Sequence, residues 1–134
     1  MSEPRWVTVL SAVFLHLESL AEHGGSEGLR DEGLLESALA RARNLYLYEG
    51  ITDLAKLAAA YAFGIARNHP FVDGDKRAAF MAIGLFLGRN GYRLQADKAE
   101  AARTMFEVAS GQVSEDELAS WIRAHMTTDR TEDK

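Results

Sequence analysis

The residue types best suited to chemistry lie together in one run of nine, His69-Pro70-Phe71-Val72-Asp73-Gly74-Asp75-Lys76-Arg77. The run contains an imidazole, which can take a proton near neutral pH, and carboxylates, which can hold Mg²⁺. A helix is expected to start as the run ends, and a helix start presents unpaired N–H groups and a partial positive charge to a phosphate. A base, a metal ligand and an anion cradle in one loop indicate phosphoryl or nucleotidyl transfer.

Most side chains of the run have a candidate role. His69 is the candidate general base, since an imidazole suits removal of a proton from an attacking hydroxyl. Lys76 and Arg77 are candidate phosphate ligands, because two cations at a helix start oppose the helix dipole unless an anion is bound. Gly74 permits close approach of an anion to the backbone, although a plain turn glycine would look the same. Phe71 is expected to anchor the loop in the core. The other histidines lack comparable neighbours, and we expect structural or surface roles for them: His16, His23 and His125.

Composition narrows the class of protein. A chain of 134 residues with 47% hydrophobic and 26% charged residues is typical of one soluble domain. The absence of cysteine excludes disulfides, thiolate metal sites and cysteine nucleophiles. A net charge of −5 argues against direct nucleic-acid binding. No signal peptide or membrane span is visible, so no membrane association and a cytoplasmic location are expected.

The apolar pattern predicts an all-α bundle of about six helices with a short flap or hairpin. A first helix carries an apolar stripe (Val9, Val13, Leu17 and Leu20, with Phe14 beside it) and ends at Gly24-Gly25. Asp31 is expected to cap a second helix. The alternation in Leu45-Tyr46-Leu47-Tyr48 predicts that residues 44–50 leave the helix as the flap. Thr52 is expected to cap a third helix, which must stop before Pro70.

The helix that follows the run, residues 75–90, is apolar nearly all round and is predicted to lie at the centre of the bundle. Gly91 is expected to follow it as a C-terminal cap, with residues 92–95 as an extended connector. Asp97 is predicted to open a fifth helix, and Ser114 with Glu117 forms a capping box for a sixth. We expect one domain over residues 1–126 and a disordered polar tail over residues 127–134.

The run resembles the Fic/Doc signature, which reads His-x-Phe-x-Asp/Glu-Gly/Ala-Asn-Gly/Lys-Arg. Segments outside the run are similar to the death-on-curing (Doc) branch: residues 23–25, 28–38, 86–87 and 90–92. The resemblance covers roughly residues 5–125 and implies a single Fic/Doc-like helical domain.

The resemblance implies a role for each residue of the site. His69 would be the catalytic base, Asp73 would hold Mg²⁺, and the phosphates of ATP would be bound by the next four residues, Gly74, Asp75, Lys76 and Arg77. Fic-type members transfer AMP, whereas Doc-type members transfer the γ-phosphoryl group. Lys76 stands where Doc proteins carry lysine and Fic enzymes a second glycine, which favours a Doc-type protein kinase.

A Doc-type reading also implies partners. The implied target is a threonine of elongation factor Tu, whose modification would block translation. The chain lacks the inhibitory motif Ser/Thr-x-x-x-Glu-Gly/Asn of some Fic proteins, so an antitoxin acting in trans is expected to bind through a disordered segment that folds as a helix. The flap near residues 46–50 would hold the target by strand addition, as in the family.

Asp75 departs from the signature, which has asparagine at this position. An ionised carboxylate accepts hydrogen bonds only and would repel a phosphate unless protonated or bound to metal. Asp75 could instead cap the helix and share a metal with Asp73. The departure leaves three alternatives open: AMP transfer, a non-catalytic antitoxin-binding module and, less favoured because the ligand set is thin, metal-dependent phosphoester hydrolysis.

Overall fold

The computed structural model describes residues 3–128, which form six α-helices and one small antiparallel sheet. The elements in chain order are α1 (Val9–His23), α2 (Glu32–Glu49), α3 (Leu54–Asn68), α4 (Asp75–Arg89), β1 (Tyr92–Leu94), α5 (Lys98–Ala109), α6 (Glu115–His125) and β2 (Met126–Thr128). The predicted all-α fold is confirmed, as is the extended connector after α4, which forms β1.

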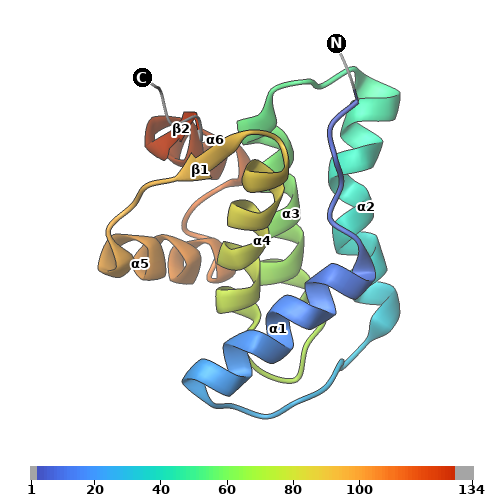
Figure 1. Cartoon of the computed structure of the whole chain (residues 1–134), viewed down its shortest axis with the longest axis vertical. Coiled ribbons are helices and arrows are strands. Elements are labelled where there is room, and N and C mark those ends of the chain that lie inside the picture. The colour runs from blue at the N-terminus through green and yellow to red at the C-terminus, as the bar shows by residue number, and fades with distance from the viewer. Residues whose placement is uncertain (1–2, 129–134) are drawn as a thin grey trace.

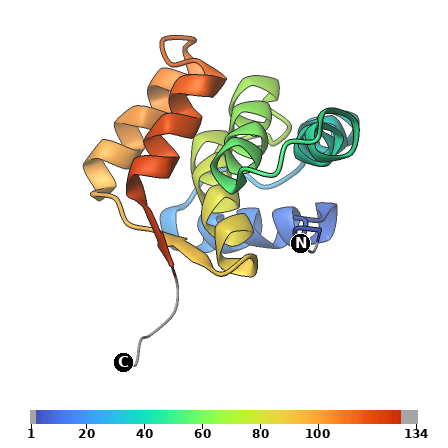
Figure 2. The same ribbon diagram turned by 90° about the horizontal axis from the view of Figure 1, so that it is seen from above.

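Helix α3 lies at the centre of the bundle (Figures 1 and 2). It packs against α2, α4, α5 and α6, and ten of its 15 residues are buried. Alanines fill much of its sequence, so neighbouring helices can approach closely. At Gly64 a Cβ atom would lie 3.0 Å from the Cα and Cβ of Ala38 in α2, which leaves little room for a side chain.

The prediction that α4 is the central helix is only partly right. One face of α4 packs on α3 and buries Ile83, Phe86 and Leu87. Gly84 and Gly88 lie on an exposed face of α4. Apolar residues all round a helix indicate burial on every side. α1, α5 and β1 also contact α4, but the face with the two glycines stays exposed.

Most helix starts follow their sequence signals. Asp31 and Asp97 cap α2 and α5, and Ser114 and Glu117 form the capping box of α6. The cap of α3 is Asp53 and not Thr52, because the Asp53 carboxylate accepts the N–H of Ala55 at 3.0 Å.

The predicted flap is wrong, because α2 remains helical through Glu49. Ala38, Ala42 and Leu45 follow one another at helical spacing and face the core, whereas an extended segment would turn alternate residues outward. Tyr46 packs edge-on against Trp6, with ring centroids 5.5 Å apart. Gly50 ends the helix in a left-handed conformation.

The C-terminal prediction is wrong for the two residues that the structure describes. Thr127 and Thr128 belong to β2, where they pair with Arg93 and Tyr92 of β1. Residues 129–134 of the predicted tail lie outside the described residues. Over residues 3–128, no helix is long and apolar enough to cross a membrane.

The apolar stripe predicted on α1 is partly turned outward. The buried residues of α1 are Ala12, His16, Ser19 and Leu20, whereas Phe14 is 60% exposed and Leu17 is 44% exposed. α1 lies at the edge of the bundle and contacts α4 and α2 (Figure 1). Two contacting helices cover only part of its apolar surface, so the rest meets solvent.

Candidate active site

The motif run joins α3 to α4 at the end of the bundle where α1 crosses (Figure 1). His69 follows the last residue of α3, Asp73 lies in the loop, and Lys76 and Arg77 are in the first turn of α4. The structure therefore brings the predicted base, metal ligand and phosphate ligands to one loop and one helix start.

His69 has a strained backbone and an accessible ring. Its φ of 51° is the only positive φ of a non-glycine residue among those described, and Pro70 prevents the helix from continuing. The guanidinium group of Arg30 supports this conformation by donating hydrogen bonds to the carbonyl groups of His69 (2.7 Å) and Asn68 (2.8 Å). The His69 side chain is 53% exposed, which leaves it open to an incoming hydroxyl.

The segment before α2 is hydrogen-bonded to the motif loop. The N–H of Val72 donates to the carbonyl of Gly28 at 3.0 Å, and the N–H of Arg30 donates to the carbonyl of Pro70 at 2.7 Å. Leu29 and Phe71 form an antiparallel bridge between these hydrogen bonds. This pairing joins the start of segment 28–38, which resembles the Doc branch, to the motif loop.

His16 contacts the motif loop from α1 and was not predicted as a site residue. It is 2% exposed, its ring stacks on Phe71 with centroids 3.9 Å apart, and its Nε2 lies 2.6 Å from the carbonyl oxygen of Asp73. Because a carbonyl only accepts, Nε2 must carry the hydrogen. The structural role expected of His16 is correct, and so is that of Phe71 as an anchor. The sequence signal for this role was that His16 lies at helical spacing from Ala12 and Leu20, which are buried in α1.

The Asp73 carboxylate fits a Mg²⁺ ligand. Oδ1 accepts the N–H of Gly74 at 2.8 Å, Oδ2 accepts the N–H of Ser26 at 3.3 Å, and Asp73 is exposed. A Cβ on Gly25 would lie 2.9 Å from Oδ2, so this approach requires a glycine. Across residues 3–128, no three carboxylates, histidines or cysteines cluster as a metal site. One carboxylate with free lone pairs still suits Mg²⁺, which keeps waters and takes phosphate oxygens as ligands.

The start of α4 is suited to an anion. A side chain caps each of the other five helices, through Thr8, Asp31, Asp53, Asp97 and Ser114. Among the described residues, no side chain caps α4, whose N-cap is Gly74 with φ 80°. Its first-turn N–H groups are therefore left without a side-chain acceptor, and these groups favour a phosphate.

The two cations beside this helix start differ in their surroundings. Arg77 donates from Nε to Ser19 Oγ at 3.1 Å and from Nη2 to the Gly24 carbonyl at 3.2 Å. These contacts hold its guanidinium near Gly74, where a Cβ would lie 3.5 Å from Nη2. Lys76 is exposed. A phosphate at the start of α4 would therefore meet a guanidinium that α1 already holds in position.

The Asp75 carboxylate turns back toward the loop. Oδ1 accepts the N–H of Phe71 at 2.9 Å, Oδ2 lies 3.7 Å from Nδ1 of His69, and the side chain is 11% exposed. Burial raises the pKa of this carboxyl, and the Phe71 N–H and the His69 ring act in the opposite direction. The suggestion that Asp75 caps α4 is wrong, because its oxygens reach residues that precede the helix.

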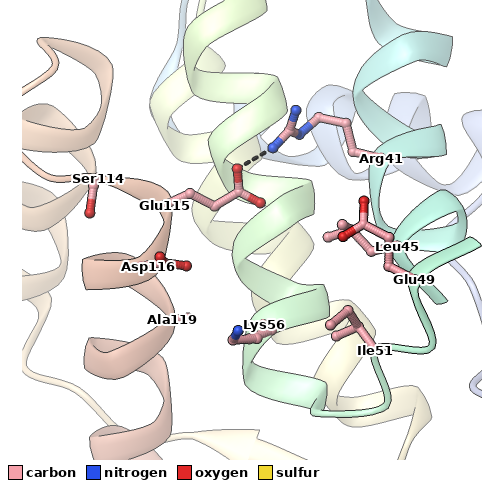
Figure 3. A pocket seen from close by; sticks show the side chains of 9 residues that line it. All are labelled: Arg41, Leu45, Glu49, Ile51, Lys56, Ser114, Glu115, Asp116 and Ala119. Atoms are coloured by element: carbon pink, nitrogen blue, oxygen red, sulfur yellow. Dashed lines mark hydrogen bonds and ion pairs between the residues drawn. The ribbon is translucent and has the colours of Figure 1, made fainter.

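A hollow lies away from the motif, between α2 and α6 over α3 (Figure 3). Its volume is about 460 Å³, and Arg41 and Glu115 form an ion pair across it. Its charged lining is completed by Glu49, Lys56 and Asp116. None of the predicted site residues is among those that line it, so it plays no part in the chemistry considered below.

Comparison with known proteins agrees with the arrangement of the site. Residues 6–87 match the Fic/DOC family. The chain is 34% identical over 119 residues to "Protein kinase doc" of Escherichia phage P1, a match that covers 89% of this chain and 94% of that protein. It is 40% identical over 100 residues to "Toxin Doc" of Mycolicibacterium smegmatis (strain ATCC 700084 / mc(2)155), covering 72% of this chain and 77% of that protein.

Proposed function

The chain belongs to the Fic/DOC family, and we propose that it is a Doc-type toxin that transfers the γ-phosphoryl group of ATP to a hydroxyl of a protein target. One relative is named a protein kinase and another a toxin. The observation that carries the proposal is the pairing of an exposed imidazole, His69, with an uncapped helix start on the same short loop. Lys76, typical of the Doc branch, favours γ-phosphoryl transfer over AMP transfer.

The proposed reaction depends on positioning and charge neutralisation. The hydroxyl oxygen of the target forms a bond to the γ-phosphorus while the bond from that phosphorus to the β,γ-bridging oxygen breaks, and ADP leaves. His69 takes the hydroxyl proton and later releases it to water. Arg77 and the first-turn N–H groups of α4 stabilise the phosphate charge. Asp73 would hold Mg²⁺, which supplies further neutralisation of the phosphates when bound.

Transfer of label from ATP tests the proposal directly. Purified chain is incubated with Mg²⁺, elongation factor Tu and ATP labelled at either the α- or the γ-phosphate. We expect label on the factor from the γ-position alone, and none when EDTA removes Mg²⁺. Label from the α-position would move the chain to AMP transfer. Absence of both labels would reject this target and, together with undetectable ATP binding in calorimetry, would favour the non-catalytic module.

A Doc-type toxin requires an antitoxin as its partner. We propose that this antitoxin binds to α1. Leu10, Phe14 and Leu17 are 80%, 60% and 44% exposed and recur at positions i, i+4 and i+7. They form one apolar stripe along the helix, which suits the apolar face of a partner helix. The opposite face of α1 contacts the motif through His16 and Ser19, so the helix would lie between a partner bound to the stripe and the site.

Replacing Leu10 and Phe14 together with serine should weaken antitoxin binding by at least about ten-fold, since each large apolar side chain contributes about 1.5–3 kcal/mol when fully buried. Calorimetry with the product of the neighbouring gene measures the loss, and phosphoryl transfer should stay unchanged. Phe106→Ser on α5 is the matched control, because Phe106 is 56% exposed away from α1. Equal affinities for the double variant and the native chain would reject this docking surface.

A further inference from the structure

We infer that Arg30 is a positioning residue for His69: its guanidinium group holds the left-handed backbone from which the imidazole reaches the target hydroxyl. The inference rests on the proposed function for the role of His69 as a base, but its structural part concerns only the backbone at that residue. Arg30 lies outside the motif run, in the segment before α2, and the signature assigns no role to it.

The end of α3 cannot complete its own hydrogen bonding. Helices commonly end on a glycine in the left-handed conformation, and the residue after it then donates its N–H back to the last turn. In α2, Gly50 takes the left-handed position. In α3 this position is occupied by His69 at φ 51°, and the next residue, Pro70, has no N–H to donate. The last carbonyl groups of α3 therefore need donors from elsewhere in the fold.

Arg30 supplies two of these donors. Its Nε donates to the carbonyl of His69 at 2.7 Å, and its Nη2 donates to the carbonyl of Asn68 at 2.8 Å. These carbonyls belong to the peptide groups on either side of the His69 Cα, so their relative direction depends on φ and ψ of His69. The planar guanidinium group presents its N–H groups in a fixed geometry. By binding both carbonyls at once, it holds both backbone angles of His69.

The backbone of Arg30 is held against the loop independently of its side chain. Its N–H donates to the carbonyl of Pro70 at 2.7 Å, and the N–H of Asp31 donates to the same oxygen at 3.1 Å. The side-chain amide of Asn68 donates to the carbonyl of Leu34 at 3.1 Å. None of these hydrogen bonds involves the guanidinium group. A substitution at Arg30 therefore removes two hydrogen bonds from the end of α3 without releasing the segment before α2.

His69 needs this support because the left-handed conformation is unfavourable for a residue with a Cβ and persists only where the surroundings impose it. The His69 side chain is 53% exposed, so packing of the ring contributes little to its position. Pro70 disfavours right-handed helical geometry at the preceding residue, so a released backbone would relax toward extended conformations. Such a change would point the imidazole away from the position at which the hydroxyl approaches.

Arg30→Ala tests the inference on the full chain by a measurement that needs no activity. The ¹³Cα and ¹³Cβ chemical shifts of His69, assigned with His69→Gln, report its backbone conformation. We expect left-handed values in the native chain, and in the variant a movement toward extended values. The variant should stay folded, since Arg30 is exposed. Unchanged His69 shifts would overturn the inference, whether or not the transfer reaction occurs.

Transfer kinetics separate positioning from contact with a substrate. A misplacement of about 1 Å can cost about 100-fold in rate, so we expect Arg30→Ala to lower kcat about 10–100-fold. KM for ATP and for the target should stay within about two-fold, because no substrate contact is removed. Arg30→Lys keeps the charge but lacks the planar fork, so it should recover only part of kcat. A raised KM with native kcat, or full recovery by lysine, would overturn the inference.

Arg67→Ala is the matched control. Arg67 is exposed in the last turn of α3, and its guanidinium group lies over the Phe63 ring, 5.3 Å from the centroid. Its replacement removes the same charge from the same end of the helix but leaves the Arg30 hydrogen bonds in place, so kcat and the His69 shifts should stay native. A loss of kcat equal to that of Arg30→Ala would overturn the inference. If the native chain transfers no label but the His69 shifts respond to Arg30→Ala alone, the proposed function fails and the structural part of the inference stands.

Discussion

His69→Ala is expected to lower phosphoryl transfer by about 10²–10⁴-fold, the range that a positioned general base contributes. Binding of ATP should be retained, because Arg77 and the first-turn N–H groups belong to α4 and do not involve the His69 side chain. The variant should also stay folded, since the ring is 53% exposed and its removal leaves no buried cavity. Transfer of γ-label to the target, calorimetry with ATP and a thermal melt measure the three effects.

His69→Asn is the matched control for the backbone of this position. Asparagine tolerates the left-handed conformation that His69 adopts at φ 51°, but it cannot act as a base. Equal loss of transfer in the alanine and asparagine variants would assign the effect to the imidazole. Transfer at the native rate in either variant would remove His69 from the proposed reaction.

Phe71→Ala is expected to reduce the free energy of unfolding by about 3–5 kcal/mol, a large share of the total of roughly 5–15 kcal/mol for a domain. Phe71 is 2% exposed, and its ring stacks on His16 beneath the loop. Its removal opens a cavity between α1 and the motif and loosens the hydrogen bond from its N–H to Asp75. Urea unfolding measures the loss, and ATP affinity should fall with it.

The adjacent residue provides a control for this substitution. Val72 is 54% exposed and lies in the same loop, so Val72→Ala should change the free energy of unfolding by less than about 0.5 kcal/mol. A loss below about 1 kcal/mol for Phe71→Ala would mean that the ring does not anchor the loop, and the support assigned to His16 would then also be wrong.

Local signals determined much of the fold. Periodic apolar residues predicted six helices, and polar residues at their starts placed the caps of α2, α5 and α6 correctly. Such signals act within one or two turns, so the sequence itself contains them. The flap was wrong for the same reason: the alternation in residues 45–48 is a local pattern, and contact of Tyr46 with Trp6, 40 positions earlier, favours the helix.

The motif run identified the candidate site, because its residues are neighbours in the chain and stay together in any fold. Their roles in the proposed reaction remain predictions. The sequence alone could not show what supports them. His16 reaches Asp73 across 57 positions, and Arg30 reaches His69 across 39. These contacts exist only because α1 and the segment before α2 pack against the α3–α4 loop.

Asp75 is the clearest example of a residue whose contacts the sequence could not determine. Its residue type alone allowed a helix cap, a metal ligand or a charge that repels phosphate, since a carboxylate can serve each purpose. The sequence determined the helical fold and the chemical groups of the loop. Only tertiary packing decided that the Asp75 carboxylate is mostly buried, accepts the N–H of Phe71 and faces His69, because the direction of a side chain depends on which backbone groups the fold places within its reach.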